Sequence, residues 1–233
     1  MAQTGSLTVT GTGVVSGIAY APVRRVQPRP QLPTGGTIDE GEQQAEIDHF
    51  AEAIVAVQNN LLERAEHAIA RGARVMAVLA GSSVTADAYD VARPEPSGAE
   101  QERALRLALE RASLASSAVG HVNAHATSTP AGDVVEAGVL TKVVPDAAVS
   151  ATKSATGHLL GGAGGLEAVL TVMALHERWA PPTLLPAGVD PELTRLGLDV
   201  VGPRGRDLPA LAAAASTSFG FGGHNVALVF TRE

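Results

Sequence analysis

The sequence contains no cysteine, which excludes disulfide bonds, thiolate metal ligands and a cysteine nucleophile within this chain. Aromatic residues make up only 3% of it, whereas 45% of residues are hydrophobic and 25 are glycine, so we expect an aliphatic core with close backbone approaches. No run reaches the roughly 18 apolar residues of a membrane span, and the N-terminus lacks the pattern of a signal peptide. We therefore expect a cytoplasmic protein that makes no membrane contact.

Positive charge is also scarce, because 17 Lys and Arg stand against 24 Asp and Glu, for a net charge of −7. Nucleic acids and anionic membranes bind concentrated positive charge, and the sequence contains no such cluster. The expected partner is a small molecule or another protein. A length of 233 residues is enough for one large domain or two small ones.

The N-terminal quarter predicts two strands, a loop and a helix. Residues 7–26 alternate β-branched and small residues around glycines, which is typical of a strand, a turn and a second strand. Residues 27–36 hold three prolines and a Gly-Gly pair, so they form neither helix nor central strand. Residues 47–61 repeat apolar side chains every three or four positions, which predicts an amphipathic helix whose apolar stripe packs into a core.

Strand-like and helix-like segments alternate over the rest of the chain, which predicts an α/β protein. The predicted strands are 74–81, 121–125, 149–151, 196–201, 211–219 and 222–230, and the predicted helices are 96–112, 132–142 and 159–178.

Three histidines, His125, His158 and His224, stand among glycines or hydroxyl residues. A lone histidine is most often structural, but His125 follows an apolar strand, where a side chain projects into a cleft. His158 precedes the long apolar helix, whose N-terminal amides favour a developing anion. Together, His125 and His158 predict a pair of N–H donors for a carboxylate or an enolate.

Metal binding is the competing interpretation of these histidines. Neither a His-x₃-His pair nor a carboxylate cluster supports it, so we expect no metal and no cofactor.

Three motifs, VNAHATSTPAGDVVEA (122–137), TKSATGHLLGGAGGLEA (152–168) and STSFGFGGHNVALVF (216–230), closely resemble the C-terminal half of the β-ketoacyl-acyl-carrier-protein synthases of fatty-acid and polyketide synthesis. The motifs agree in order and spacing, and the resemblance covers residues 63–233. It implies a thiolase-like half, with helices layered on a five-stranded mixed sheet, that acts on an acyl carrier protein or an acyl thioester.

The resemblance also implies roles for individual residues. His125 and His158 correspond to the histidine pair that stabilises the carbanion formed when malonyl-carrier protein loses carbon dioxide. Lys153 corresponds to the lysine of the motif and Glu167 to its carboxylate partner, although an ion pair that only holds the loop is an equal alternative.

Substrate contacts are implied for four further residues, namely Thr127, Thr129, Phe219 and Phe221. The second phenylalanine corresponds to the gate of the acyl pocket, and a core role is the alternative for both phenylalanines. Ala126 departs from the family, which has glycine after the first histidine. If this position requires positive φ, the added Cβ costs about 1 kcal/mol or more.

Residues 1–65, which include GVVSGIAYAP (13–22), resemble the opening of enzyme I of the phosphoenolpyruvate-dependent sugar phosphotransferase system. The phosphorylated histidine of that family has no counterpart here, so we do not expect phosphotransfer. We divide the chain into an enzyme I-like segment, 1–65, and a synthase-type domain, 66–233. The two resemblances meet in one helical pattern at 61–67, which indicates a chimera.

Three hypotheses follow. The chain is a synthase-type protein that carries the histidine half of the site and depends on a partner for the nucleophile, because the family's cysteine lies in an N-terminal half that this chain lacks. Alternatively, it is an inactive fragment that forms a homodimer or pairs with a complete synthase. The third hypothesis is an enzyme I-like partner-binding module, favoured only by residues 1–65.

Overall fold

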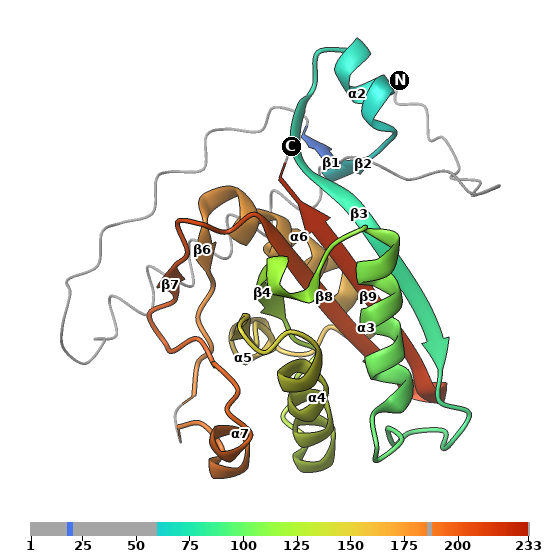
Figure 1. Cartoon of the computed structure of the whole chain (residues 1–233), viewed down its shortest axis with the longest axis vertical. Coiled ribbons are helices and arrows are strands. Elements are labelled where there is room, and N and C mark those ends of the chain that lie inside the picture. Colours follow the sequence, from blue (N-terminus) through green and yellow to red (C-terminus); the bar gives the residue numbers. More distant parts are fainter. Residues whose placement is uncertain (1–17, 21–59, 186–187, 233) are drawn as a thin grey trace.

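The centre of the molecule is a mixed sheet with the strand order β3-β9-β8-β4-β5 (Figure 1). The computed structural model describes residues 18–20, 60–185 and 188–232. The strands are β3 (Arg74–Ala86), β4 (Val119–Asn123), β5 (Ala148–Ser150), β8 (Ala213–Gly220) and β9 (His224–Thr231). β9 runs antiparallel to both β3 and β8, whereas β8, β4 and β5 run parallel to one another. The expected five-stranded mixed sheet and α/β class are confirmed.

Two short strands extend this sheet beyond β3. β1 (Ile18–Tyr20) pairs antiparallel with both β2 (Asn60–Leu62) and β3. β1 falls within residues 7–26, for which two strands are predicted. The rest of residues 7–26 lies outside the described residues, and so do residues 47–59 of the predicted helix. The helix prediction is wrong at Leu61, which lies in strand β2. The division at residue 65 stays a prediction.

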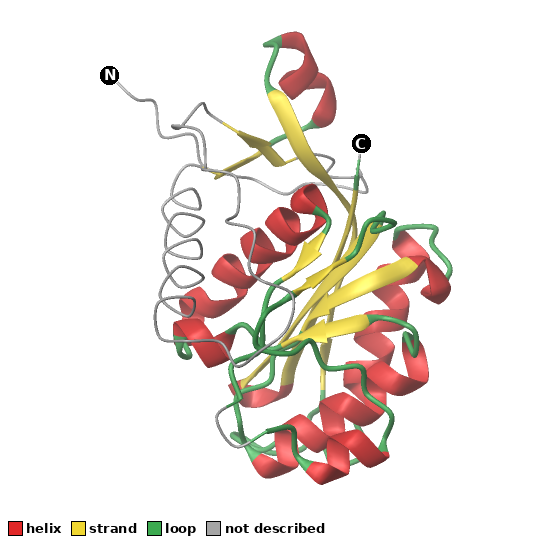
Figure 2. Cartoon of the chain, turned by 90° about the vertical axis from the view of Figure 1, so that its left-hand side faces the viewer, coloured by secondary structure: helices red, strands yellow, loops and turns green. Residues whose placement is uncertain are grey.

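Helices cover both faces of the sheet (Figure 2). α3 (Ala99–Arg111) and α4 (Pro130–Val143) lie on one face, and α6 (Ala163–Glu177) lies on the other. Neighbouring residues of a strand point to opposite faces. Accordingly, Ala215 of β8 packs with α3 and α4, while Ala214 packs with α6.

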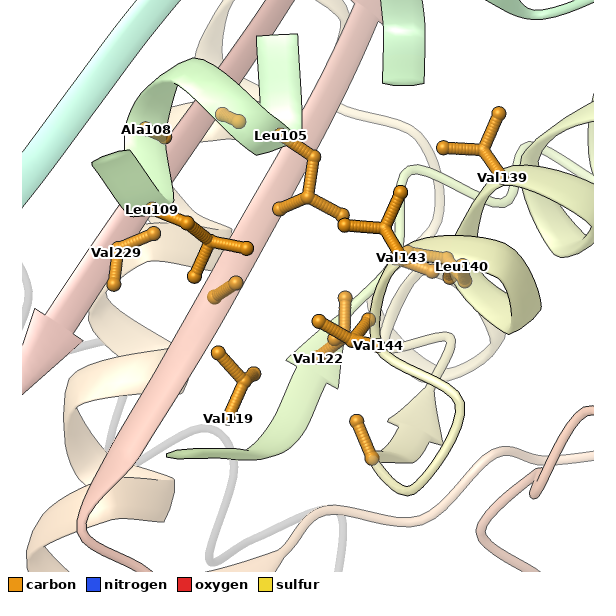
Figure 3. Packing of buried hydrophobic residues seen from close by; sticks show 14 of the residues in the cluster. Leu105, Ala108, Leu109, Val119, Val122, Val139, Leu140, Val143, Val144 and Val229 are labelled. Atoms are coloured by element: carbon orange, nitrogen blue, oxygen red, sulfur yellow. The ribbon is translucent and has the colours of Figure 1, made fainter. Parts of the chain in front are cut away.

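The core between the sheet and the first helix layer is aliphatic, as the composition predicts (Figure 3). Leu105 of α3, Leu140 of α4 and Val122 of β4 are all buried within it. Each such side chain contributes about 1.5–3 kcal/mol by leaving water. This core holds α3 and α4 against the strands whose ends form the site described below.

Several helix boundaries differ from the predicted ones. α3 begins three residues later than predicted, because Gly98 has a left-handed φ of 65° and ends the preceding loop. α4 begins two residues earlier, at Pro130, a residue that suits the first turn of a helix. The predicted helix 159–178 is divided into a 3₁₀ turn, η2 (Leu160–Gly162), and α6.

Strand boundaries differ as well. The prediction that a strand ends at Gly81 is wrong, since β3 continues through a bulge there to Ala86. α3 crosses the strand at this glycine, where a Cβ would lie 2.1 Å from the carbonyl oxygen of Ala108. The strand predicted at 196–201 is also wrong, because it makes a single bridge, from Val200 to Val149.

Among the described residues, no helix is long and apolar enough to cross a bilayer. The remaining short elements were not predicted. These elements are α2 (Ala65–Ala70), η1 (Ser116–Ala118), α5 (Lys153–Thr156), β6 (Trp179–Ala180), α7 (Pro191–Arg195), β7 (Arg206–Asp207) and η3 (Phe221–Gly223).

Candidate active site

The loop after β4 carries His125 and is held by a buried carboxylate of α4. The backbone N–H groups of His125 and Ala126 donate to the two oxygens of Glu136, at 2.9 and 2.8 Å. The hydroxyl of Thr217 on β8 donates to the same carboxylate at 2.7 Å. Burial raises the pKa of Glu136, while these hydrogen bonds lower it. Glu136 therefore fixes the backbone that presents His125.

Sequence reasoning missed Glu136, although it lies within the first motif. The signal was present, because Glu136 stands among the apolar residues Val134, Val135, Ala137 and Val139 of α4. An unpaired acid at a core position is costly, so it indicates a nearby set of donors.

Ala126, which stands where the family has glycine, has a positive φ of 29°. The backbone of Ala126 therefore lies in the left-handed region, which a residue with a Cβ adopts only at a cost. Glu136 maintains this geometry through the N–H of Ala126.

Lys153 and Glu167 form a buried ion pair beside this loop. Lys153 begins α5 and Glu167 lies in α6, and their side chains are 4% and 2% exposed. Burial raises the pKa of Glu167 to about 7, against the opposing effect of the hydrogen bond from Lys153. The Lys153 Nζ also lies 3.4 Å from the Nδ1 of His125. The pair therefore links α6 to the ring of His125.

His158 lies in an exposed position between α5 and η2. Its ring centroid is 5.7 Å from that of His125, and the two rings are nearly perpendicular, at 89°. The long helix α6 begins at Ala163, five residues after His158 rather than directly after it. The third candidate, His224, is exposed at the start of β9.

A cavity of about 580 Å³ opens at this histidine pair. Both histidines line it, and so do the four residues for which substrate contacts were predicted, Thr127, Thr129, Phe219 and Phe221. The ring of Phe219 lies 5.8 Å from that of His125, whereas Phe221 is 74% exposed. The structure thus brings these predicted residues around one space.

Hydrogen bonds define which ring nitrogen carries the proton. Burial, together with the charge of Lys153 and the neighbouring His158, lowers the pKa of His125 to about 3, so its ring is neutral at pH 7. The ammonium of Lys153 can only donate, so the Nδ1 of His125 accepts and the proton is on Nε2. The N–H of Leu160 donates to the Nδ1 of His158 at 3.3 Å, which places the proton of its neutral form on Nε2 as well.

The histidine pair can therefore offer two Nε2–H donors to one acceptor. Within the described part of the chain, no group of three or more His, Asp or Glu side chains could hold a metal ion.

Comparison with known proteins shows which families this chain resembles. Residues 76–185 match the model of the family "Beta-ketoacyl synthase, C-terminal domain". The chain is similar to the 3-oxoacyl-[acyl-carrier-protein] synthase 2 of a Synechocystis species, with 46% identity over 74% of this chain and 41% of the relative. The corresponding protein of Vibrio cholerae is 41% identical over 74% of this chain and 42% of that relative. The chain thus spans about two fifths of the length of these curated relatives.

Solved structures show the same fold. A crystal structure of a beta-ketoacyl synthase from Burkholderia phymatum has a TM-score of 0.68 and 37% identity, over 73% of this chain and 41% of that one. A second structure, described as a type II polyketide acyl-carrier protein in complex with its ketosynthase bound to the hexaketide, has a TM-score of 0.68 and 28% identity over 73% of this chain and 42% of that one. The thiolase-like fold is therefore confirmed, and residues 76–185 are similar to beta-ketoacyl synthase C-terminal domains.

Proposed function

We propose that this domain carries the decarboxylating half of a β-ketoacyl-acyl-carrier-protein synthase site and acts on a malonyl thioester of an acyl carrier protein. The observation that carries the proposal is the convergence of His125 and His158 on one cavity, with both rings protonated on Nε2. The relatives named above are 3-oxoacyl-[acyl-carrier-protein] synthases by name, and one solved structure is of a ketosynthase in complex with its acyl carrier protein.

The chemistry follows from the two Nε2–H donors. The Nε2–H groups of His125 and His158 donate to the carbonyl oxygen of the malonyl thioester. The bond from the α-carbon to the carboxylate breaks, carbon dioxide leaves, and its electron pair forms an enolate with the negative charge on that oxygen. Donors already oriented toward a developing charge stabilise the transition state more than the ground state. Lys153 acts by holding the Nδ1 of His125 as an acceptor, and Glu167 keeps the lysine in place.

Condensation requires a second component. The enolate attacks an acyl group held as a thioester on a cysteine, and this chain contains no cysteine. We therefore infer that a nucleophile-bearing synthase chain completes the reaction, either in a pair with this chain or as a separate donor of the acyl group.

The decisive test is the release of carbon dioxide from malonyl-carrier protein by the purified chain. We expect the variants His125→Ala and His158→Ala each to lose at least about 100-fold in rate, because each removes one oriented donor. His224→Ala is the matched control, since it removes an exposed histidine outside the pair, and it should retain the full rate. Equal rates for all four proteins, or no release by any of them, would contradict the proposal and favour an inactive fragment that forms a homodimer or pairs with a complete synthase.

The resemblance of residues 1–65 to enzyme I is a separate proposal, for a module that binds the phosphocarrier protein. A pull-down of the full chain with that protein tests it. Failure to retain the carrier removes this proposal and leaves the histidine site unaffected.

A further inference from the structure

The edge of the sheet at β3 is open over most of its length (Figure 1). On one side, β9 pairs with β3 from Val78 to Ala86. On the other side, β1 pairs only with the first residues of β3, up to Ala77. No other described strand pairs with β3 on that side, so the backbone from Val78 to Ala86 has an unpaired edge within the described part of the chain.

This edge lacks the features that protect an exposed strand. Proline, lysine and other charged side chains on an edge strand prevent it from pairing with other chains. Residues 78–86, VLAGSSVTA, contain none of these, and Val84 is 68% exposed. The side chain of Arg111 donates to the carbonyl of Ser82 at 2.7 Å, so this carbonyl is open to a donor from outside the β3–β9 pair. Such an edge favours the addition of a further strand.

The chain itself leads onto this edge. β1 runs antiparallel to β3, with Ile18 opposite Ala77. An extension of the same pairing therefore takes the residues before Ile18 toward Ala86. Residues 1–17 lie outside the described part of the chain, and they outnumber the residues of the open edge, which a strand of the same length covers.

The sequence before β1 fits both faces of this edge. β-branched residues, which suit strands, fill most of the even-numbered positions, namely Thr8, Thr10, Thr12, Val14 and Ile18. The odd-numbered positions include the glycines 11, 13 and 17. On one face of β3, α3 lies close, because the hydroxyls of Ser83 and Thr85 donate to backbone carbonyls of α3. Glycines on that face of an added strand leave room for α3.

The bulge in β3 sets the register of such a strand. It leaves Ala80 without a partner in β9. A strand that also skips Ala80 and continues from the pair of Ile18 and Ala77 has Thr12 opposite Val84. Neighbouring residues of a strand point to opposite faces, so the even-numbered residues then share the face of exposed Val84 and the glycines share the face of α3.

We propose that residues 9–17 continue β1 along the open edge of β3 and close it as an added antiparallel strand. The glycines then lie within one strand and form no turn. A tethered segment reaches this edge at an effective concentration in the millimolar range, whereas a second copy of the chain has to supply its strand from solution. The enzyme I-like segment is thus a structural part of the synthase-type sheet. The inference is independent of the proposed function, because its test requires no acyl substrate.

Engineered disulfides in the full chain test this pairing, because the native sequence contains no cysteine that could interfere. Thr12→Cys/Val84→Cys places two thiols opposite each other on one face, and oxidised glutathione should link them within one molecule. Gly13→Cys/Val84→Cys is the matched control, because the new thiol at position 13 points to the other face. It should form the intramolecular disulfide at least about tenfold more slowly. Mass spectrometry of non-reduced peptides measures both rates.

Equal rates for the two pairs indicate a tail without a fixed register, and no disulfide in either pair indicates an open edge; both results overturn the inference. The single variant Val84→Cys tests for a second copy, since a disulfide between two chains would place that copy on the edge instead.

Hydrogen exchange of the full chain gives an independent readout. Thr12→Pro removes a backbone donor and disrupts a strand, so it should speed the exchange of amides in residues 78–86 by about three- to tenfold. Thr4→Pro, which lies outside the added strand, is the control and should leave this exchange unchanged. Exchange that is equally slow in Thr12→Pro and in the native chain contradicts the added strand.

Discussion

Replacing Ala126 with glycine should relieve strain beside the candidate catalytic histidine. The φ of 29° holds an L-residue in the left-handed region, at a cost of about 1–2 kcal/mol. Glycine adopts this geometry freely but loses roughly 0.5–1 kcal/mol more backbone entropy on folding than alanine does. The methyl group of Ala126 is partly buried against the core, and its loss costs about 0.4 kcal/mol, half the value of a fully buried methylene. At the midpoints of these ranges the net change is about 0.4 kcal/mol of stabilisation, and it lies between about 0.4 kcal/mol of destabilisation and 1.1 kcal/mol of stabilisation.

Ala124, two residues earlier, is the matched control. It is 3% exposed and is not among the positive-φ residues of the described chain, so Ala124→Gly loses burial and entropy without relieving strain. That sum is about 1.5 kcal/mol of destabilisation. The two substitutions should therefore differ by about 2 kcal/mol in unfolding free energy.

Urea unfolding followed by far-ultraviolet circular dichroism measures both variants against the native chain. In a protein of this size the difference corresponds to about 4–8 °C in melting temperature. If Ala126→Gly destabilises the protein as much as Ala124→Gly does, the backbone at Ala126 is not strained, and the reasoning is refuted.

Three further predictions concern the buried ionisable groups. Lys153→Met should cost about 3–5 kcal/mol of unfolding free energy, because it leaves the Glu167 carboxyl group buried without its cation. The double variant Lys153→Met/Glu167→Leu should recover most of this stability. A double variant as unstable as the single one would contradict this prediction. The loss of stability in Lys153→Met should be larger at pH 8 than at pH 5.5. Burial raises the pKa of Glu167 to about 7, so its carboxyl group is neutral in the folded state at pH 5.5 and adds to stability there. This contribution is lost as the pH rises toward about 7, and at pH 8 the variant has no cation to stabilise the carboxylate. Glu136→Gln should cost about 2–3 kcal/mol and lower carbon dioxide release, because an amide cannot accept all three donors of the carboxylate; unchanged urea unfolding would show that the carboxylate does not hold the loop. Complete burial lowers the pKa of His121 to about 3, so its contribution to stability is present above pH 6.5 and is lost as the pH falls toward 3. His121→Leu should therefore reduce the pH dependence of the unfolding free energy in that window by up to about 1.4 kcal/mol per pH unit, and an unaltered slope would exclude a neutral buried His121.

The sequence predicted which residues lie together better than it predicted the ends of the elements that hold them. His125 and His158 were identified from local context and motif order, and the structure brings their rings within 5.7 Å. The strand thought to end at Gly81 continues to Ala86, because the missing Cβ of this glycine serves the crossing of α3 rather than a turn. A glycine has the same appearance in the sequence in either role.

Sequence reasoning missed Glu136 for a physical reason. It lies on a predicted helix and is charged, so a solvent-facing position was the default. Its burial follows from the packing of α4 against the sheet. Whether a polar atom then has a hydrogen-bond partner depends on donors that lie far away in the chain, such as Thr217 for Glu136.

The sequence alone determined the aliphatic core, the alternation of strands and helices, the absence of an internal thiol and the order of the three motifs. These are local or compositional properties, which depend on side-chain period and residue type and not on contacts. The tertiary structure decided which nitrogen of His125 carries its proton and which carboxylate holds the loop that contains Ala126. Those properties arise from contacts between residues 28 to 92 positions apart in the chain, such as Lys153 with His125 and His125 with Thr217, and only folding brings such groups within hydrogen-bonding distance.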